Sequence, residues 1–249
     1  MHRLMSMSEL KITEAVAKSK NVLYIYDMLS AIFAQLGCIT DLRSGKNRYE
    51  LVIDVPSSYK ELLVSEIEDK IADVISVNYK YAYFSKRINL SGLSQIEREL
   101  LLTALISADI DEDKKYVSKR LKNYVEYTLD GIFNFRLKAL KEKWADIISY
   151  IPPNFRTKEL NDFIIYLIRD KLGKRVYFDG GQVYDKRYNL LKRVQLLTGD
   201  SGEISIVKEI LLSGAGEVEL GSPLPEKDES YLKLFYGERV RFSQGYFNP

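Results

Sequence analysis

Two kinds of hydrophobic pattern, helical spacing and short strand-like runs, follow one another in the first third of the chain. Hydrophobic residues recur at helical spacing through residues 21–36 and again through 59–79, and these two stretches are predicted to be helices. Gly37 stops the first helix, while Ser57 and Ser58 are candidate caps for the second. Short apolar runs predict strands at residues 10–15, 38–42 and 48–55. These elements predict an N-terminal α/β lobe over residues 1–88.

The middle of the chain, residues 89–173, has helical spacing almost throughout. Ser94 lies three residues before Glu97, which is a capping-box pattern ahead of an apolar run. Three further helices are predicted at about residues 112–129, 132–150 and 157–172. We therefore expect a central, bundle-like helical segment.

The last part of the chain, residues 174–249, returns to mixed patterning. Asp179, Gly180 and Gly181 separate two strand-like runs, which predicts a β-hairpin. Helices and strands then alternate over residues 203–213, 217–220, 228–237 and 238–243. The order β-β-α-β-α-β fits an open sheet that carries helices. The whole chain is thus predicted to be an α+β protein with a C-terminal α/β lobe.

Composition and charge add few constraints. The single cysteine, Cys38, cannot form a disulfide within the chain, and the longest apolar stretch, near residues 100–108, is too short to span a bilayer. No apolar signal-peptide core begins the sequence, so we expect a cytoplasmic protein without membrane contact. Residues 169–193 carry a net +5 and residues 200–238 a net −6. One interpretation is that residues 169–193 form a basic patch on the surface. The other is that the two stretches neutralise each other in space or are simply solvated.

Several chemistries are excluded because the residue types that they need are missing. The only histidine, His2, lies at the terminus, so the Gly199–Gly202 sequence, which looks like a serine-protease nucleophile motif, has no triad partner. Zinc sites need clusters of cysteine or histidine, and the acidic run 109–113 lacks the glycine and glutamate of a calcium loop. We expect no cofactor and no metal, and nominate no catalytic residue. A carboxylate-dependent enzyme stays open because distant segments can bring two acids together.

Two stretches mix aromatic and basic residues. Residues 77–87 include Tyr79 and Tyr81 together with Lys86 and Arg87, and residues 174–193 include basic and tyrosine residues around a predicted hairpin. Bases can stack on such tyrosines while the cations contact phosphate, which makes nucleic acid a candidate partner. The competing interpretation is that the tyrosines pack in the core. The second stretch contributes the cations Lys186 and Arg187.

The segment 130–137 begins a predicted central helix. One helical stripe runs along this helix through Phe133, Leu137, Leu140, Trp144, Ile148 and Ile151. Phe135 and Arg136 lie off the stripe, so they are predicted to anchor the helix against a second neighbour. A buried guanidinium needs an acceptor, for which Asp130 and Asp162 are the candidates. Contact of Arg136 with a phosphate or a partner is the alternative.

Three segments, in order, resemble the bacterial YtxC-like family of sporulation-associated proteins. They are the helix and tyrosine-rich connector at 70–84, the Phe-Arg-Leu segment at 130–137, and the helix at 161–167 that precedes the 174–185 hairpin. The chain departs from the family pattern at residues 149–160, where the family has a continuous acidic helical stretch. The resemblance implies a cytoplasmic bacterial protein linked to sporulation, and it implies no activity, cofactor or catalytic residue.

The sequence therefore favours a non-catalytic protein that acts through protein interaction. A nucleic-acid-binding protein that uses residues 77–87 or 174–193 is the first alternative, and a carboxylate-dependent enzyme is the second.

Overall fold

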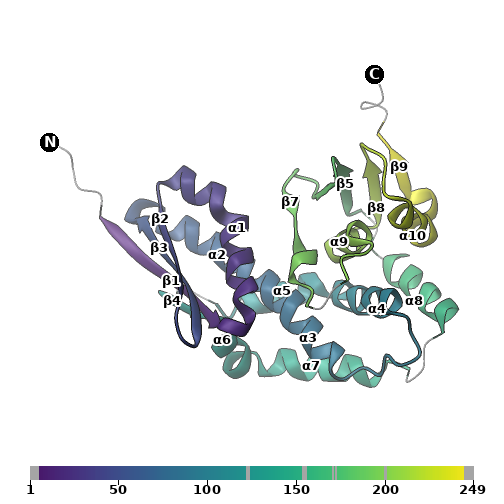
Figure 1. Cartoon of the computed structure of the whole chain (residues 1–249), viewed down its shortest axis with the longest axis horizontal. Coiled ribbons are helices and arrows are strands. Elements are labelled where there is room, and N and C mark those ends of the chain that lie inside the picture. The colour runs from purple at the N-terminus through teal and green to yellow at the C-terminus, as the bar shows by residue number, and fades with distance from the viewer. Residues whose placement is uncertain are drawn as a thin grey trace. The chain divides into compact units, whose positions relative to one another are not determined.

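The computed structural model describes residues 6–121, 124–152, 156–169, 171, 173–198 and 201–243 and has an α+β fold (Figure 1). The chain forms two compact units, each made of two stretches: unit 1 is Met1–Tyr79 with Asp111–Asp146, and unit 2 is Lys80–Ile110 with Ile147–Pro249. This division differs from the expected boundaries at 88/89 and 173/174, because the central helices are shared between the units. His2, Pro153, Gly199 and Asp200 lie outside the described residues.

Unit 1 is built on a four-stranded sheet in the order β2-β3-β1-β4. Its strands are β1 (Met7–Ala15), β2 (Ile39–Ser44), β3 (Arg48–Pro56) and β4 (Glu126–Thr128). β1 and β2 are both antiparallel to β3, whereas β4 is parallel to β1. The first three strands were predicted from the sequence, and β4 was not. The helix expected over 112–129 is instead a short helix, α5 (Ile110–Ser118), which ends well before β4.

Two helices cover one face of this sheet (Figure 1). They are α1 (Ser19–Leu36) and α2 (Lys60–Val74), and both pack on β3. Leu10 of β1 lies opposite Ile53, and Ile12 lies opposite Leu51, and all four side chains are fully buried. Their alternation with more polar residues is the pattern of a half-covered antiparallel sheet. The same alternation puts the carboxylate of Glu14 on the buried face.

The ends of these helices only partly follow the predicted signals. Gly37 ends α1 with a φ of 68°, a left-handed conformation that glycine adopts without strain, so this prediction is confirmed. The prediction that Ser57 or Ser58 caps α2 is wrong. Residues Ser57–Tyr59 form a 3-10 turn, α2 has no side-chain cap, and the Ser57 hydroxyl donates to the carbonyl of Ser6 at 2.9 Å.

A five-residue π-helix, Ile75–Tyr79, follows α2 and ends where unit 1 meets unit 2 in the sequence. All five of its residues are buried. The wider turn of a π-helix is uncommon, and it often occurs at functional positions. Here it brings Tyr79 into the core of unit 1.

Unit 1 also contains α6 (Leu129–Arg136) and most of α7 (Lys138–Ser149). The single helix expected over 132–150 is interrupted at Leu137, whose φ and ψ of −113° and 37° are not helical. Leu137, Leu140 and Trp144 are buried, as the predicted stripe requires. The ring of Phe133 lies 4.5 Å from that of Tyr79 and 5.9 Å from that of Trp144, between centroids.

Unit 2 contains a five-stranded sheet in the order β7-β6-β5-β8-β9. Its strands are β5 (Arg175–Asp179), β6 (Gln182–Tyr184), β7 (Leu190–Leu191), β8 (Glu217–Leu220) and β9 (Val240–Phe242). The β5–β6 hairpin confirms the prediction from Asp179-Gly180-Gly181. β8 is parallel to both β5 and β9. The two-residue β7 was not predicted.

The helices of unit 2 are α3 (Lys80–Ser85), α4 (Gln95–Ala108), α8 (Thr157–Arg169), α9 (Ser205–Ser213) and α10 (Glu226–Tyr236). Short 3-10 turns occur at Arg193–Leu196 and Gly237–Arg239 in unit 2, and at Val16–Lys18 in unit 1. α4 begins with the predicted capping box: the Ser94 hydroxyl accepts from the Glu97 amide, and Glu97 accepts from the Ser94 amide. This prediction is confirmed.

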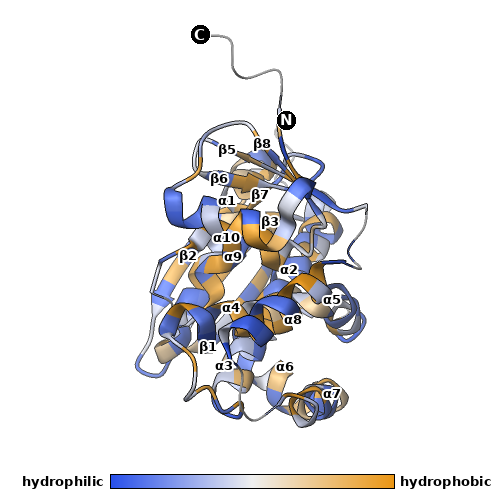
Figure 2. Cartoon of the chain, turned by 90° about the vertical axis from the view of Figure 1, so that its right-hand side faces the viewer, coloured by the Kyte–Doolittle hydropathy of each residue, from blue (hydrophilic) through white to orange (hydrophobic). Residues whose placement is uncertain are grey.

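α4 and α9 form the centre of unit 2, and both are largely hydrophobic (Figure 2). A buried ion pair joins them, since the Lys208 ammonium lies 2.8 Å from Glu99. Glu99 also accepts hydrogen bonds from the amide and the hydroxyl of Ser201, both at 2.9 Å. A buried carboxylate with this many donors is fully compensated for its loss of water.

Candidate binding cleft

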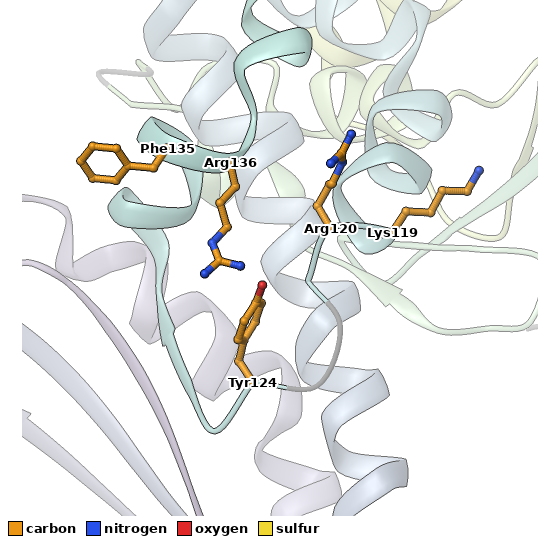
Figure 3. Close-up of a pocket in the computed structure, with 5 residues that line it drawn as sticks. All are labelled: Lys119, Arg120, Tyr124, Phe135 and Arg136. Carbon is orange, nitrogen blue, oxygen red and sulfur yellow. The ribbon is translucent and has the colours of Figure 1, made fainter.

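Unit 1 has an open cleft of about 460 Å³ that is lined by Lys119, Arg120, Tyr124, Phe135 and Arg136 (Figure 3). We call it the basic cleft. Three short segments form its walls: the residues that follow α5, the residues that precede β4, and the last turn of α6. Three of the five lining side chains are cationic, two are aromatic and none is acidic.

The basic cleft contains a cation–π pair formed by Arg136 and Tyr124. The guanidinium of Arg136 lies 4.6 Å from the centroid of the Tyr124 ring, and the two side chains point toward one another (Figure 3). Arg120 lies 5.3 Å from the ring of Tyr116 in the same way. Such cation–π contacts hold a guanidinium in place while leaving its N–H groups free to bind an anion.

Phe135 is the most exposed large hydrophobic residue in the described part of the chain, with 86% of its surface accessible. It projects from α6 on the side away from Arg136 (Figure 3). Helix α6 therefore presents an apolar ring and a guanidinium at adjacent positions. The Phe135 ring therefore contributes little to the core of unit 1 and is accessible to a binding partner.

The structure corrects the predicted role of Phe135 and Arg136 as buried anchors. Both side chains are exposed, and they form the last turn of α6 just before the interruption at Leu137. Asp130 does not bind Arg136 but accepts two hydrogen bonds from Arg48, each at 2.9 Å. Asp162 is exposed on α8, in unit 2. Arg48 is therefore the arginine that anchors unit 1, and sequence spacing did not identify it.

The Arg48–Asp130 pair joins β3 to α6 within unit 1. Arg48 also donates to the Thr13 hydroxyl at 2.8 Å. Although burial raises the pKa of the Asp130 carboxyl, the hydrogen bonds and positive charge of Arg48 hold it below its ordinary value. The bidentate geometry fixes the start of α6, and thereby the position of the basic cleft.

A buried polar cluster lies beside this pair, and it contains Tyr79. The Tyr79 hydroxyl donates to Glu14, and the Asn21 side chain donates to Glu14 at 3.1 Å and to Asn78 at 3.2 Å. Burial raises the pKa of Glu14, although the hydrogen bonds from Tyr79 and Asn21 lower it. Burial and the charge of Glu14 raise the pKa of Tyr79 as well. This cluster is therefore a core network.

The predicted nucleic-acid contacts at residues 77–87 are wrong for the two tyrosines. Tyr79 and Tyr81 are 3% and 6% exposed, because residues 75–85 are helical and not a strand. Neither ring offers a face for a base. Lys86 and Arg87 are exposed just after α3, and Lys186 and Arg187 are exposed in the loop between β6 and β7.

The sequence held one signal for the basic cleft that the prediction did not use. Residues 114–124 contain five basic residues, two of them Lys119 and Arg120, and end in Tyr124. Lys119, Arg120 and Tyr124 lie near Phe135 and Arg136 because the chain passes through β4 between them. Local patterning did not predict β4.

The described residues hold no group of three or more histidine, cysteine, aspartate or glutamate residues that could bind a metal ion. Among the helices of the described residues, none is both long and apolar enough to cross a membrane.

Comparison with known proteins identifies no relative: no family model, no curated protein and no solved structure matches the chain.

Proposed function

We propose that this chain is a non-catalytic, cytoplasmic binding protein that acts through protein interaction, and that the basic cleft takes an acidic segment of its partner. The observation that carries the proposal is the exposed ring of Phe135, next in sequence to Arg136, at a cleft whose described lining holds three cations and no carboxylate. Its link to sporulation rests on the resemblance to YtxC-like proteins alone.

The chemistry of the basic cleft suits a protein partner in two respects. Burial of the Phe135 ring against an apolar side chain would remove a highly exposed aromatic surface from water. Arg120 and Arg136 present planar donor groups that match partner carboxylates in bidentate geometry. Aromatic and arginine residues are the types that most often dominate the binding energy of protein interfaces.

Nucleic acid is the alternative occupant, and one contact makes it the weaker candidate. The face of Tyr124 toward the cleft is already covered by the Arg136 guanidinium. A base could stack there only after Arg136 moved away, which would lose the cation–π contact. While Arg136 stays in place, Phe135 is the aromatic residue of the described lining that offers a free face to a base.

The proposal is tested by fluorescence anisotropy with a labelled peptide of alternating glutamate and leucine residues. We expect saturable binding that weakens with salt, and a loss of about tenfold or more in affinity for both Phe135→Ala and Arg136→Glu. The matched controls are Lys138→Glu, an exposed cation two residues from Arg136, and Tyr150→Ala, an aromatic that is 85% exposed. Both controls should bind like the wild type.

Two results would contradict this assignment. The first is no saturable peptide binding at low salt, or equal losses in the two cleft variants and the two controls. The second is tighter binding of a single-stranded oligonucleotide that depends on Phe135 and Arg136, which would favour the nucleic-acid alternative. Deleting the gene in the source bacterium and counting heat-resistant spores tests the sporulation link separately, and unchanged counts would argue against it.

A further inference from the structure

We infer that unit 2 carries a second binding site, independent of the basic cleft, that holds the ammonium group of an organic cation against stacked tyrosines. The site is a pocket of about 170 Å³ on the β5–β6 hairpin, which we call the tyrosine pocket. Its side walls include Tyr177, Tyr184, Tyr188, Asp179 and Glu219. Three aromatic rings and two carboxylates in one concavity are the complement of a cation.

Tyr177 and Tyr188 form the aromatic wall of the tyrosine pocket. Their ring centroids lie 4.9 Å apart at an interplanar angle of 19°, so the rings are stacked. Tyr188 is nevertheless 69% exposed. The Tyr188 ring is thus accessible to solvent at the pocket, and the electron-rich face of an exposed tyrosine can attract a cation.

The loop between β6 and β7 holds Tyr188 in a conformation that costs free energy. Tyr188 has a φ of 60°, a left-handed value that bulky side chains rarely adopt. Asp185 maintains the turn by accepting hydrogen bonds from the amides of Arg187 and Asn189, at 2.8 and 2.9 Å. Its other carboxylate oxygen accepts from the Asn189 side chain at 3.0 Å. The loop is therefore built to place the Tyr188 ring over Tyr177.

The two carboxylates of the tyrosine pocket differ in their partners. Glu219 lies 3.5 Å from Arg175, so an internal cation already neutralises part of its charge. For Asp179, the described residues supply neither a hydrogen bond nor an ion pair to the carboxylate. A Cβ on Gly221 would lie 3.1 Å from an oxygen of Asp179, so any larger residue there would press on this carboxylate. Asp179 is the charge left for a ligand.

The size of the tyrosine pocket limits the ligand class. Sites for drug-sized molecules have volumes of roughly 300–1,000 Å³, and this pocket is smaller. It suits one ammonium head, either that of a small amine such as choline or that of a lysine side chain from another protein. Both sources share the cation–π and carboxylate chemistry, and the test separates them.

Titration calorimetry on the full chain tests this inference. The three probes are choline, its neutral carbon isostere and a glycine-flanked peptide with a single lysine. We expect saturable binding of choline or of the peptide and none of the isostere. Tyr188→Asn keeps the left-handed turn, since asparagine tolerates positive φ, while removing the ring. We expect Tyr188→Asn and Asp179→Asn each to weaken binding by about tenfold, as expected for loss of one desolvated cation contact.

The matched controls are Tyr166→Ala and Asp162→Asn, which remove an exposed tyrosine and an exposed aspartate from α8. Both should leave binding unchanged, and so should Arg136→Glu in the basic cleft. Tighter binding of the peptide than of choline would assign the site to a protein lysine, and the reverse to a small amine. Three results would overturn the inference. They are binding of the neutral isostere as tight as that of choline, no saturable binding of either cation, and wild-type binding by folded Asp179→Asn.

Discussion

Glu14 shows how one residue can decide the chemistry of a core. It sits on the helix-covered face of β1, where the strand's alternation would normally place an apolar side chain, and it is fully buried. Hydrogen bonds from Asn21 and from Tyr79, which lies 65 positions away in the sequence, offset the cost of burying the Glu14 carboxyl group. Tyr79 lies at the end of the buried π-helix, which local patterning did not predict, and it was therefore interpreted as a candidate stacking residue.

At the residue scale we predict that Tyr79→Phe lowers the free energy of unfolding by about 1.5–3 kcal/mol near neutral pH, the usual contribution of a hydrogen bond to a charged group. Burial has already raised the pKa of Glu14 above 4.5 in the folded protein, and the lost Tyr79 hydrogen bond raises it further. The folded variant then takes up a proton before the unfolded chain does, so its stability recovers as the pH falls toward 4.5.

Chemical denaturation at several pH values measures this effect, with Tyr59→Phe as the control because that ring is 44% exposed. A stability deficit for Tyr79→Phe that stays constant between neutral and acidic pH would contradict the assigned role of Glu14.

At the scale of elements, α4 and α9 are joined by a charge pair inside an otherwise apolar contact. Lys208 is fully buried and Glu99 is 3% exposed. Lys208→Met removes the charge that neutralises the buried Glu99 carboxylate, although Glu99 keeps its hydrogen bonds from Ser201. We therefore predict that this variant lowers the free energy of unfolding by about 3–5 kcal/mol. Thermal and urea denaturation provide the measurement.

The control for this prediction is Lys227→Met, which breaks an exposed pair with Glu203 on the surface of the same unit. Exposed pairs stabilise proteins little, so this variant should match the wild type. The double variant Lys208→Met/Glu99→Leu should recover part of the loss because no unpaired charge remains. If Lys208→Met and Lys227→Met were equally stable, the buried pair would have no structural role.

The sequence predicted elements that depend on local signals and missed those that depend on distant partners. Gly37 and the Ser94–Glu97 capping box act within one helix end, and both predictions are confirmed. β4 has three residues and gains its hydrogen bonds from β1, more than a hundred residues earlier. The π-helix and the break at Leu137 likewise follow from packing around Tyr79 and Trp144, which periodicity does not report.

The candidate sites divide in the same way. Phe135 and Arg136 were singled out because they lie off the buried stripe, and that geometric reasoning was sound. Their assignment to a buried contact was wrong, because no second element of the described chain covers the side of α6 on which they lie, and both are exposed. The tyrosine pocket could not be derived, since it needs Tyr188 in a left-handed conformation that no sequence pattern predicts.

At the scale of the whole molecule, each unit is assembled from two separate stretches of chain. The fragment 1–88 was expected to form a lobe, but it lacks β4 and the Asp130 that binds Arg48. We predict that this fragment does not unfold cooperatively by circular dichroism, whereas the full chain does. A sharp melting transition for the fragment at the temperature of the full chain would contradict the division into two units.

The parallel pairing of β1 with β4 also has a consequence for synthesis on the ribosome. β1 emerges early, but its outer edge stays open until residue 128 has been made, over a hundred residues later. At about 5–20 residues per second, this interval lasts roughly 6–23 seconds. During that time the N-terminal strands present unpaired backbone groups to other nascent chains, the situation in which strand edges aggregate. The newborn protein is therefore expected to depend on chaperones that shield this edge until β4 arrives.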